Sequence, residues 1–152
     1  MSWREISEDD VWSSMTSAEV TAVRTKLLTS GQSDPLVKII EQVTLECRTA
    51  VKSCSDNVLS EVVTEVPGGM VYHGVAIIRY RALSRFGLVM EHGGDSRLEE
   101  YRTAQKYLNE VARCLIKVDR AGAAEDEAAP QGMSPRISAR SRRFSRTQQE
   151  GI

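Results

Sequence analysis

Aromatic side chains are scarce in this sequence: two Phe, two Trp and four Tyr make up 5% of the 152 residues. A hydrophobic core must therefore be built mainly from Val, Ile, Leu and Ala. Long apolar runs are also missing, since no stretch reaches 18 apolar residues, and we expect no membrane-spanning helix. The first five residues are polar and acidic and lack the apolar region of a signal peptide, so we expect the protein to stay in the compartment where it is made.

The net charge is also small, at −1 with a pI of about 6.2. This balance argues against a general attraction to nucleic acid or to an anionic membrane. The three cysteines, Cys47, Cys54 and Cys114, are odd in number and have no C-x-x-C spacing. We therefore expect all of them to be reduced thiols in a cytosolic protein.

Residue patterns for catalysis and metal binding are missing as well. The two histidines, His73 and His92, have no second histidine or cysteine at metal-ligand spacing. The sequence contains no G-x-S-x-G, P-loop or G-x-G-x-x-G motif. Glu99 and Glu100 are adjacent, but neighbouring helix residues point in different directions and do not form a carboxylate pair. We therefore expect a protein that is not an enzyme and that holds neither a cofactor nor a metal ion.

Four or five helical segments are predicted before residue 119. Ser7 precedes the acidic residues 8–10, which is typical of a helix N-terminus because the free N–H groups there carry partial positive charge. Thr16 and Glu19 have capping-box spacing and predict a second helical segment through about Leu28.

The third segment has the clearest helical pattern. Asp34 is a natural N-cap, and Pro35 suits the first helical position, where its missing N–H costs nothing. Apolar residues then recur every three or four positions as far as Cys54, which predicts one continuous apolar face. A helix from Pro35 to Cys54 would be roughly 30 Å long.

The segment from Ser55 to Gly69 interrupts the helices. Its Val-Val-Thr-Glu-Val run at 62–66 favours extended structure, and Pro67 ends that run. We expect a long loop or a short hairpin arm between the two main groups of helices. A loop of this length inside a compact domain is commonly functional.

Two further helices are predicted, one from Met70 to Phe86 and one from Asp95 onward. The first is apolar around more than half of its circumference, which is typical of a helix at the centre of a bundle or in an interface. Its arginines, among them Arg79 and Arg81, are expected to extend along the bundle surface or to pair with acidic side chains. The second helix has a regular apolar stripe and a charged opposite side.

These segments together predict an all-α bundle of four or five helices in residues 1–118. We expect Ile40, Val43, Ile78 and Leu108 to be buried in its single core. A long loop or hairpin arm would join the two main groups of helices, and an extended tail would follow the bundle.

Residues 119–152 lose the helical pattern and form a predicted flexible tail. Five arginines stand among serines between Ser134 and Arg146, with few large apolar side chains. Such a composition does not bury enough surface to offset the entropy of ordering. In a helix, Ile137 and Phe144 would share one face with three of the arginines, and this face could bind an acidic partner. The predicted docking residues are Arg136, Ile137, Arg140, Arg143 and Phe144.

The order of segments resembles the small head–tail connector, or adaptor, proteins of tailed bacteriophages, and is most similar to the Mu-type family. In that family an "A..IARYRL" helix is followed by an "R.EEY..A...L..IA" helix. The corresponding stretches here are Val75 to Leu83 and Arg97 to Ala112. The resemblance covers roughly Asp9 to Val118, and the tail of more than 30 residues departs from it.

The resemblance implies a structural protein of the virion neck that is made in the host cytoplasm. It would form a homo-oligomeric ring, commonly of twelve copies, beneath the portal protein. Genome DNA would pass through the ring without sequence-specific binding, and a neck or tail-completion protein would bind below it. We expect Glu61, Val62, Val63 and Glu65 at a subunit boundary or along the channel, where the carboxylates would repel DNA phosphates.

Two other classes of protein remain open. A helical regulatory or nucleic-acid-binding module would use the arginine-rich tail, although the sequence has no evident basic recognition helix. An enzyme would need a site assembled across subunits.

Overall fold

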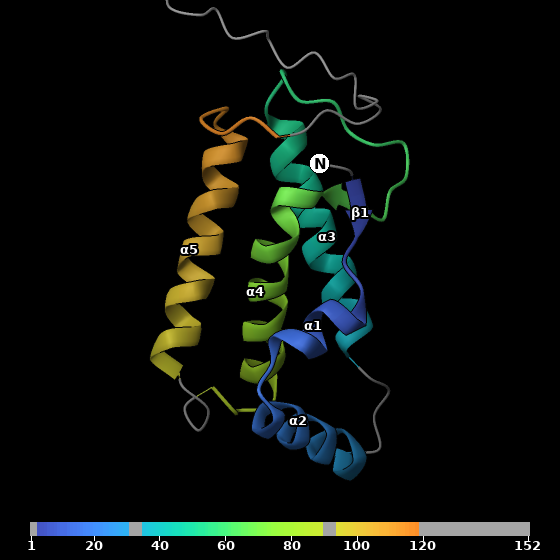
Figure 1. The fold of residues 1–152 in the computed structure, drawn as a ribbon, viewed down its shortest axis with the longest axis vertical. Helices are drawn as coiled ribbons and strands as arrows, with labels where there is room; N and C mark the ends of the chain where they lie inside the picture. The colour runs from blue at the N-terminus through green and yellow to red at the C-terminus, as the bar shows by residue number, and fades with distance from the viewer. Residues whose placement is uncertain (1–2, 31–34, 90–93, 119–152) are drawn as a thin grey trace, which may run out of the picture.

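The computed structural model describes residues 3–30, 35–89 and 94–118, and it is a small, mostly α-helical bundle (Figure 1). The predicted fold class is therefore confirmed. The elements are β1 (Trp3–Glu5), α1 (Glu8–Ser14), α2 (Ser17–Ser30), α3 (Leu36–Ser53), β2 (Glu65–Pro67), α4 (Gly68–Arg85) and α5 (Gly94–Ala112). Among the described residues, no helix combines the length and the apolar character needed to cross a bilayer. The predicted docking residues of the tail lie outside the described ranges.

Helices α3, α4 and α5 pack against one another and form the body of the molecule, with α1 and α2 lying across the lower part of α4 in Figure 1. Helix α4 is the most buried of them, because its apolar residues surround most of its circumference. Its central position was predicted from that composition. Ile77, Ile78 and Leu83 have no exposed surface.

The first two helices begin with the caps predicted from the sequence. At α1 the hydroxyl oxygen of Ser7 accepts from the Asp10 amide, and the Asp10 carboxylate accepts from the Ser7 amide at 3.0 Å. At α2 the Glu19 carboxylate accepts from the Thr16 amide at 2.6 Å, and the Thr16 hydroxyl oxygen accepts from the Glu19 amide at 3.3 Å. Each pair satisfies N–H groups that a helix start leaves open.

Helix α3 starts and ends within one residue of the predicted range. Its apolar stripe is the buried face, and Val43, Cys47 and Val51 have no exposed surface. Asp34, the predicted N-cap, lies outside the described residues. Of the four predicted core residues, Val43, Ile78 and Leu108 are buried, whereas Ile40 is half-buried at the edge of the core.

A two-stranded sheet joins the N-terminal segment to the end of the loop that precedes α4. Strand β1 pairs antiparallel with β2, so that Trp3 lies opposite Pro67 and Glu5 opposite Glu65. Of the two alternatives for residues 55–69, the structure has the long loop, since β2 pairs with the N-terminal strand and forms no hairpin. The extended run predicted at 62–66 overlaps β2, but the sequence could not reveal its pairing, because the partner strand is about 60 positions away.

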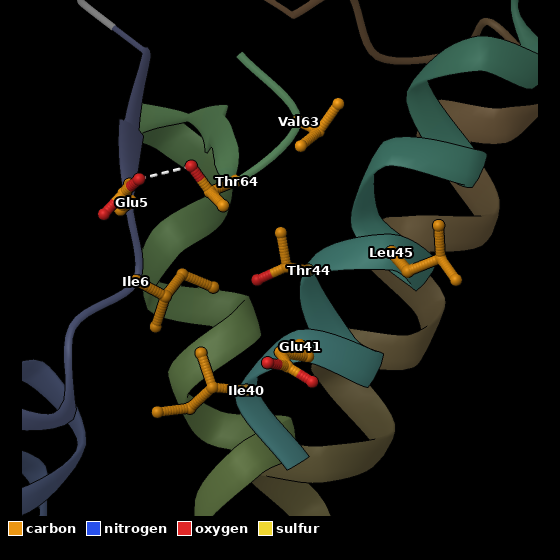
Figure 2. A pocket seen from close by; sticks show the side chains of 8 residues that line it. All are labelled: Glu5, Ile6, Ile40, Glu41, Thr44, Leu45, Val63 and Thr64. Carbon is orange, nitrogen blue, oxygen red and sulfur yellow. Dashed lines mark hydrogen bonds between the residues drawn. The ribbon is translucent and has the colours of Figure 1, made fainter. Parts of the chain in front are cut away.

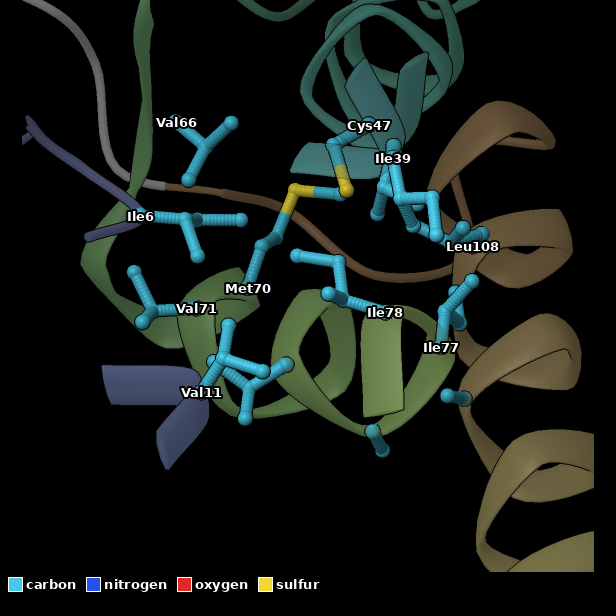
Figure 3. Close-up of a cluster of buried hydrophobic side chains, with 14 of the residues drawn as sticks. Ile6, Val11, Ile39, Cys47, Val66, Met70, Val71, Ile77, Ile78 and Leu108 are labelled. Carbon is cyan, nitrogen blue, oxygen red and sulfur yellow. The ribbon is translucent and has the colours of Figure 1, made fainter. Parts of the chain in front are cut away.

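The core lies where α3, α4 and α5 meet the segment between β1 and α1 (Figure 3). Met70 of α4 and Cys47 of α3 point toward one another there. Gly74 gives Ile6 room, because a Cβ at position 74 would lie 2.6 Å from Ile6 Cδ1. The glycine therefore lets the N-terminal segment pack closely on α4.

The cysteines require a correction. Cys54 and Cys114 form a disulfide whose Cα atoms are 5.2 Å apart, and Cys47 is buried with a free thiol. The expectation of three reduced thiols is therefore wrong for two of them. The odd number and the spacing of the cysteines could not reveal this pair, because the fold brings the ends of α3 and α5 together across 60 residues.

Candidate interaction surface

Several apolar side chains are exposed on α3 and on the loop between α3 and β2. Leu45 is 66% exposed and Val63 is 74% exposed, although both are aliphatic. Val37, Val58 and Val62 are exposed in the same two segments. Aliphatic side chains concentrated in this way are typical of a surface that another protein covers.

A hollow of about 370 Å³ lies between this loop, α3 and the end of β1 (Figure 2). We call it the α3 hollow. In Figure 2, Val63 lies above Thr44 and Leu45 lies to the right of Thr44 on α3, while Ile6 lies to the left and Ile40 below. Its lining residues are Glu5, Ile6, Ile40, Glu41, Thr44, Leu45, Val63 and Thr64.

The lining chemistry suits an apolar side chain with a polar neighbour. Four of the residues are aliphatic, and the polar ones are two carboxylates and two threonine hydroxyls. The Thr64 hydroxyl donates to the Glu5 carboxylate, whereas Glu41 makes no hydrogen bond or ion pair with the residues that the structure describes. None of the eight lining residues is a His, Cys, Lys or Arg.

Arg48 of α3 holds the loop in place. Its guanidinium donates to three backbone carbonyl groups: Nη1 to Val62 and Glu65, each at 2.8 Å, and Nη2 to Ser60 at 2.9 Å. The same group lies 5.9 Å from the centre of the Trp3 ring, within cation–π distance. Charge-assisted hydrogen bonds of this kind present Val62 and its neighbours in one geometry.

The role of Arg48 was missed by sequence reasoning. The arginine lies beside the apolar stripe of α3, where a charged residue is ordinarily solvated. No signal in the sequence indicates this role, because the carbonyl groups that Arg48 binds are 12 to 17 residues away from it along the chain.

The four predicted loop residues lie in different surroundings. Glu61, Val62 and Val63 are exposed, and Val63 borders the α3 hollow. Glu65 belongs to β2 and is half-buried, and its carboxylate accepts from the Ser60 hydroxyl at 2.6 Å. The structure therefore brings the two valines to the surface and turns Glu65 toward its own loop.

A second cluster of charged residues lies inside the fold, between α2, α4 and α5. Arg97 Nε donates to Glu19 Oε1 at 2.8 Å, and Arg97 also pairs with Glu100. Arg79 pairs with Glu100 from the other side and donates to the carbonyl of Ser14 at 2.6 Å. Arg79 thus pairs with an acidic residue, and Arg81 likewise pairs with Glu46 at 2.7 Å.

The opposite charges of this cluster stabilise the packing of α2, α4 and α5. Burial raises the pKa of Glu19, but hydrogen bonds from Arg97 and from the Thr16 amide outweigh it and hold that pKa below its usual value. Burial lowers the pKa of Arg79, yet the group stays charged at neutral pH. Arg97 therefore pairs with both Glu19 and Glu100 and joins α2 to α5.

The histidines do not assemble a metal site in the described part of the chain. His73 stacks on Tyr107 with ring centres 3.9 Å apart, and burial lowers its pKa. His92 lies outside the described residues. Across residues 3–30, 35–89 and 94–118, no three His, Cys, Asp or Glu side chains are grouped so that they could hold a metal ion.

Comparisons with known proteins give no relative. No family model, curated protein or solved structure matches this chain. The resemblance of its segment order to the phage adaptors therefore stays a prediction.

Proposed function

We propose that this chain is a structural protein of a phage virion, a head-to-tail adaptor that forms a ring beneath the portal. The observation that carries this proposal is the exposed apolar surface of Leu45, Val62 and Val63 beside the α3 hollow. Arg48 holds that surface in one geometry, which lowers the entropy that a contact must overcome. The order of the helices and the two motif-like stretches also support the adaptor.

A ring subunit needs a surface that its neighbour covers. In this proposal the next copy inserts an apolar side chain into the α3 hollow and covers Leu45 and Val63. Burial of such side chains stabilises the contact by roughly 25 cal/mol per Å² of apolar surface, less the cost of association. A hollow of this size admits a few side chains, so the free protein is a weakly associating monomer and the portal drives ring closure.

The remaining partners follow the adaptor hypothesis. Twelve copies bind the portal protein above and a neck or tail-completion protein below, and genome DNA passes without sequence-specific binding. Glu61, which is exposed, supplies negative charge that keeps DNA phosphates from binding the wall. Arg136, Arg140 and Arg143 of the tail pair with acidic groups on the portal or on a neighbouring copy.

Electron microscopy of the full chain mixed with purified portal rings tests the proposal. The expected result is a second ring on the portal, formed by the wild-type chain and lost in the Leu45→Asp and Val63→Asp variants. Leu115→Asp is the matched control, because Leu115 is 70% exposed and lies beyond α5, away from the hollow. A chain that never binds portal rings, or whose Val63→Asp variant binds them fully, would refute the proposed function.

The second candidate is a helical module that binds nucleic acid through the arginine-rich tail. The five arginines between positions 136 and 146 favour it. Binding of phosphates by several arginines releases counterions, so its affinity would fall steeply with salt. A salt titration of DNA binding by the full chain distinguishes the two candidates: steep, tail-dependent binding to DNA together with no binding to portal favours this module.

A further inference from the structure

Helix α5 ends in a turn that normally contains glycine. The Leu115 amide donates to the Glu110 carbonyl at 2.9 Å, and the Cys114 amide donates to the Val111 carbonyl at 3.0 Å. These two bonds are the pattern of a Schellman motif, whose residue after the helix adopts a left-handed backbone. Here that residue is Cys114, with φ at 60°.

Helix α4 ends in the same turn with the expected residue. The Leu88 amide donates to the Leu83 carbonyl at 2.9 Å and the Gly87 amide to the Ser84 carbonyl at 3.1 Å, while Gly87 has φ at 69°. Among the described residues, Cys114 is the one non-glycine residue with positive φ. A side chain is disfavoured in this backbone region, so helix capping does not explain a cysteine there. The bond to Cys54 does.

The two cysteines of the disulfide differ in their exposure to solvent. Cys54 follows the last residue of α3 and is 1% exposed, whereas Cys114 is exposed. The third cysteine, Cys47, has no exposed surface, and burial raises its pKa to about 12. Cys47 is therefore an inert internal reference, since thiolates rather than thiols react.

The bundle has other contacts that join the same two helix ends. Val51 of α3 and Val111 of α5 are fully buried in the core close to the disulfide in sequence. Beyond Cys114, Ile116 and Val118 are half-buried against the core, and these residues connect the bundle to the tail. The disulfide thus fastens the exit of the tail, while the helices pack through apolar contacts of their own.

We propose that Cys54 and Cys114 are a reversible redox pair, a dithiol while the protein is made and assembled in the cytoplasm and a disulfide in the released particle. The two compartments come from the proposed function, but the reversible pair does not depend on it. Cytoplasmic glutathione keeps thiols reduced, and the outside of a virion is oxidising. In the released particle, the disulfide would hold the end of α5, from which the tail continues, against the end of α3.

The chemistry balances with common reagents. In oxidation the two thiols lose two protons and two electrons to molecular oxygen, which becomes hydrogen peroxide, and the S–S bond forms. In reduction one thiolate of a dithiol attacks the sulfur of exposed Cys114, and Cys54 leaves and takes up a proton. The second thiol of the reagent then closes its own disulfide and frees Cys114 as a thiol.

Thiol alkylation of the purified full chain tests the pair. After mild treatment with dithiothreitol, iodoacetamide should modify the exposed Cys114 in a chain that keeps its helical circular dichroism, and the buried Cys54 and Cys47 should react only after unfolding. Removal of the reductant in air should restore the disulfide. Loss of the helical signal on reduction, or equal alkylation of all three cysteines in the folded chain, would overturn the proposal.

The variant Cys114→Gly separates the turn from the bond. Glycine fits the left-handed backbone, so this variant should melt at a higher temperature than the reduced wild type and should not respond to dithiothreitol. Cys54→Ser, which keeps Cys114 in place, should melt like the reduced wild type. A Cys114→Gly variant that melts below the reduced wild type would show that the cysteine is there for another reason.

The compartment is tested on particles. Alkylation of assembled heads taken from intact cells should modify Cys114, and alkylation of released virions should leave Cys114 unmodified. If Cys54 and Cys114 were in the same redox state in heads and in virions, the assignment of the dithiol to assembly and of the disulfide to the released particle would be wrong. If the chain is found in no particle, the proposed function fails, while the result for the purified chain still decides whether the pair is reversible.

Discussion

Arg97 and Glu19 are 78 residues apart in the sequence, and Arg97 donates to the Glu19 carboxylate with both Nε, at 2.8 Å, and Nη2, at 3.0 Å. The Glu19 side chain is 1% exposed. Glu19 also caps the helix to which it belongs, so one carboxylate both begins α2 and fastens that helix to α5. Two demands on one side chain make this contact a sensitive point of the fold.

Removal of the Glu19 carboxylate should destabilise the protein strongly. Glu19→Ala leaves Arg97 with its longer contact to Glu100, at 3.3 Å, and removes the acceptor of the Thr16 amide, so we expect the free energy of unfolding to fall by about 3–5 kcal/mol. Urea denaturation at pH 7 measures this change. The control is Lys106→Ala, whose partner Glu110 lies 3.9 Å away and whose side chain is 79% exposed, and its effect should stay below about 1 kcal/mol. Equal losses of stability in Glu19→Ala and Lys106→Ala would contradict the structural role of the buried ion pair.

Stability should fall in acid because of Glu19 and Asp10. The Ser7 amide chiefly lowers the pKa of Asp10, and Arg97 with Thr16 lowers that of Glu19 despite burial. Their usual pKa values are 3.8 and 4.5, so the unfolded chain binds protons before the folded chain does. The stabilisation is therefore complete above about pH 4.5 and is lost as the pH falls through the lowered folded values.

Urea midpoints between pH 7 and pH 3 measure this acid dependence. Glu19→Gln should flatten the slope below pH 4.5, because glutamine does not titrate. A Glu19→Gln variant with the slope of the wild type would show that other carboxylates set the acid limit. Asp10→Asn provides the comparison at the exposed cap.

Charge in the centre of α4 should disrupt the bundle. Ile78 has no exposed surface, and Ile78→Asp would bury an unpaired carboxylate, so we expect the free energy of unfolding to fall by more than about 4 kcal/mol. Thermal melting and the soluble yield measure the effect. Tyr72→Asp is the matched control on the same helix, because Tyr72 is 70% exposed, and it should cost about 1 kcal/mol or less. An unchanged melting temperature for Ile78→Asp would contradict the core.

Loss of the Arg48 guanidinium should loosen the loop without unfolding the helices. Arg48→Met keeps the aliphatic stem but removes the donors to three carbonyl groups, which should lower the free energy of unfolding by about 1–3 kcal/mol. Hydrogen exchange of residues 60–65 should rise, and binding to portal rings should weaken. Lys52→Met, on the last turn of the same helix, should change neither measurement. An unaltered loop in Arg48→Met would show that the loop is held by other contacts.

Removal of residues 119–152 should leave the stability of the bundle unchanged and abolish the function of the tail. Val118 is the last described residue that packs against the core, and truncation after Val118 should leave the melting temperature within about 2 °C. Attachment to portal-bearing heads should be abolished, because the predicted docking residues are gone. Calorimetry and an infectivity assay with the truncated chain measure the two effects. A truncated protein that still completes infectious particles would contradict the predicted role of the tail.

Local pattern in the sequence determined the helices of this protein. The capping boxes at Ser7 and Thr16 use partners three residues away, and the apolar stripe of α3 repeats every three or four residues. Such interactions are decided by neighbours along the chain, so the bounds of α3 and the central position of α4 could be predicted. The exposed valines of the loop were also singled out, since an extended run between helices has no apolar stripe to join.

Tertiary structure decided every contact that joins distant segments. The pairing of β1 with β2, the Cys54–Cys114 disulfide and the Arg97–Glu19 ion pair each connect residues 60 or more positions apart. Sequence spacing carries no sign of such pairs, because their geometry exists only after α3, α4 and α5 have packed. The same holds for the α3 hollow, whose lining comes from β1, from α3 and from the loop that Arg48 holds. Periodicity shows which side of a helix is buried, but the partner on that side is chosen by the shape of the whole core.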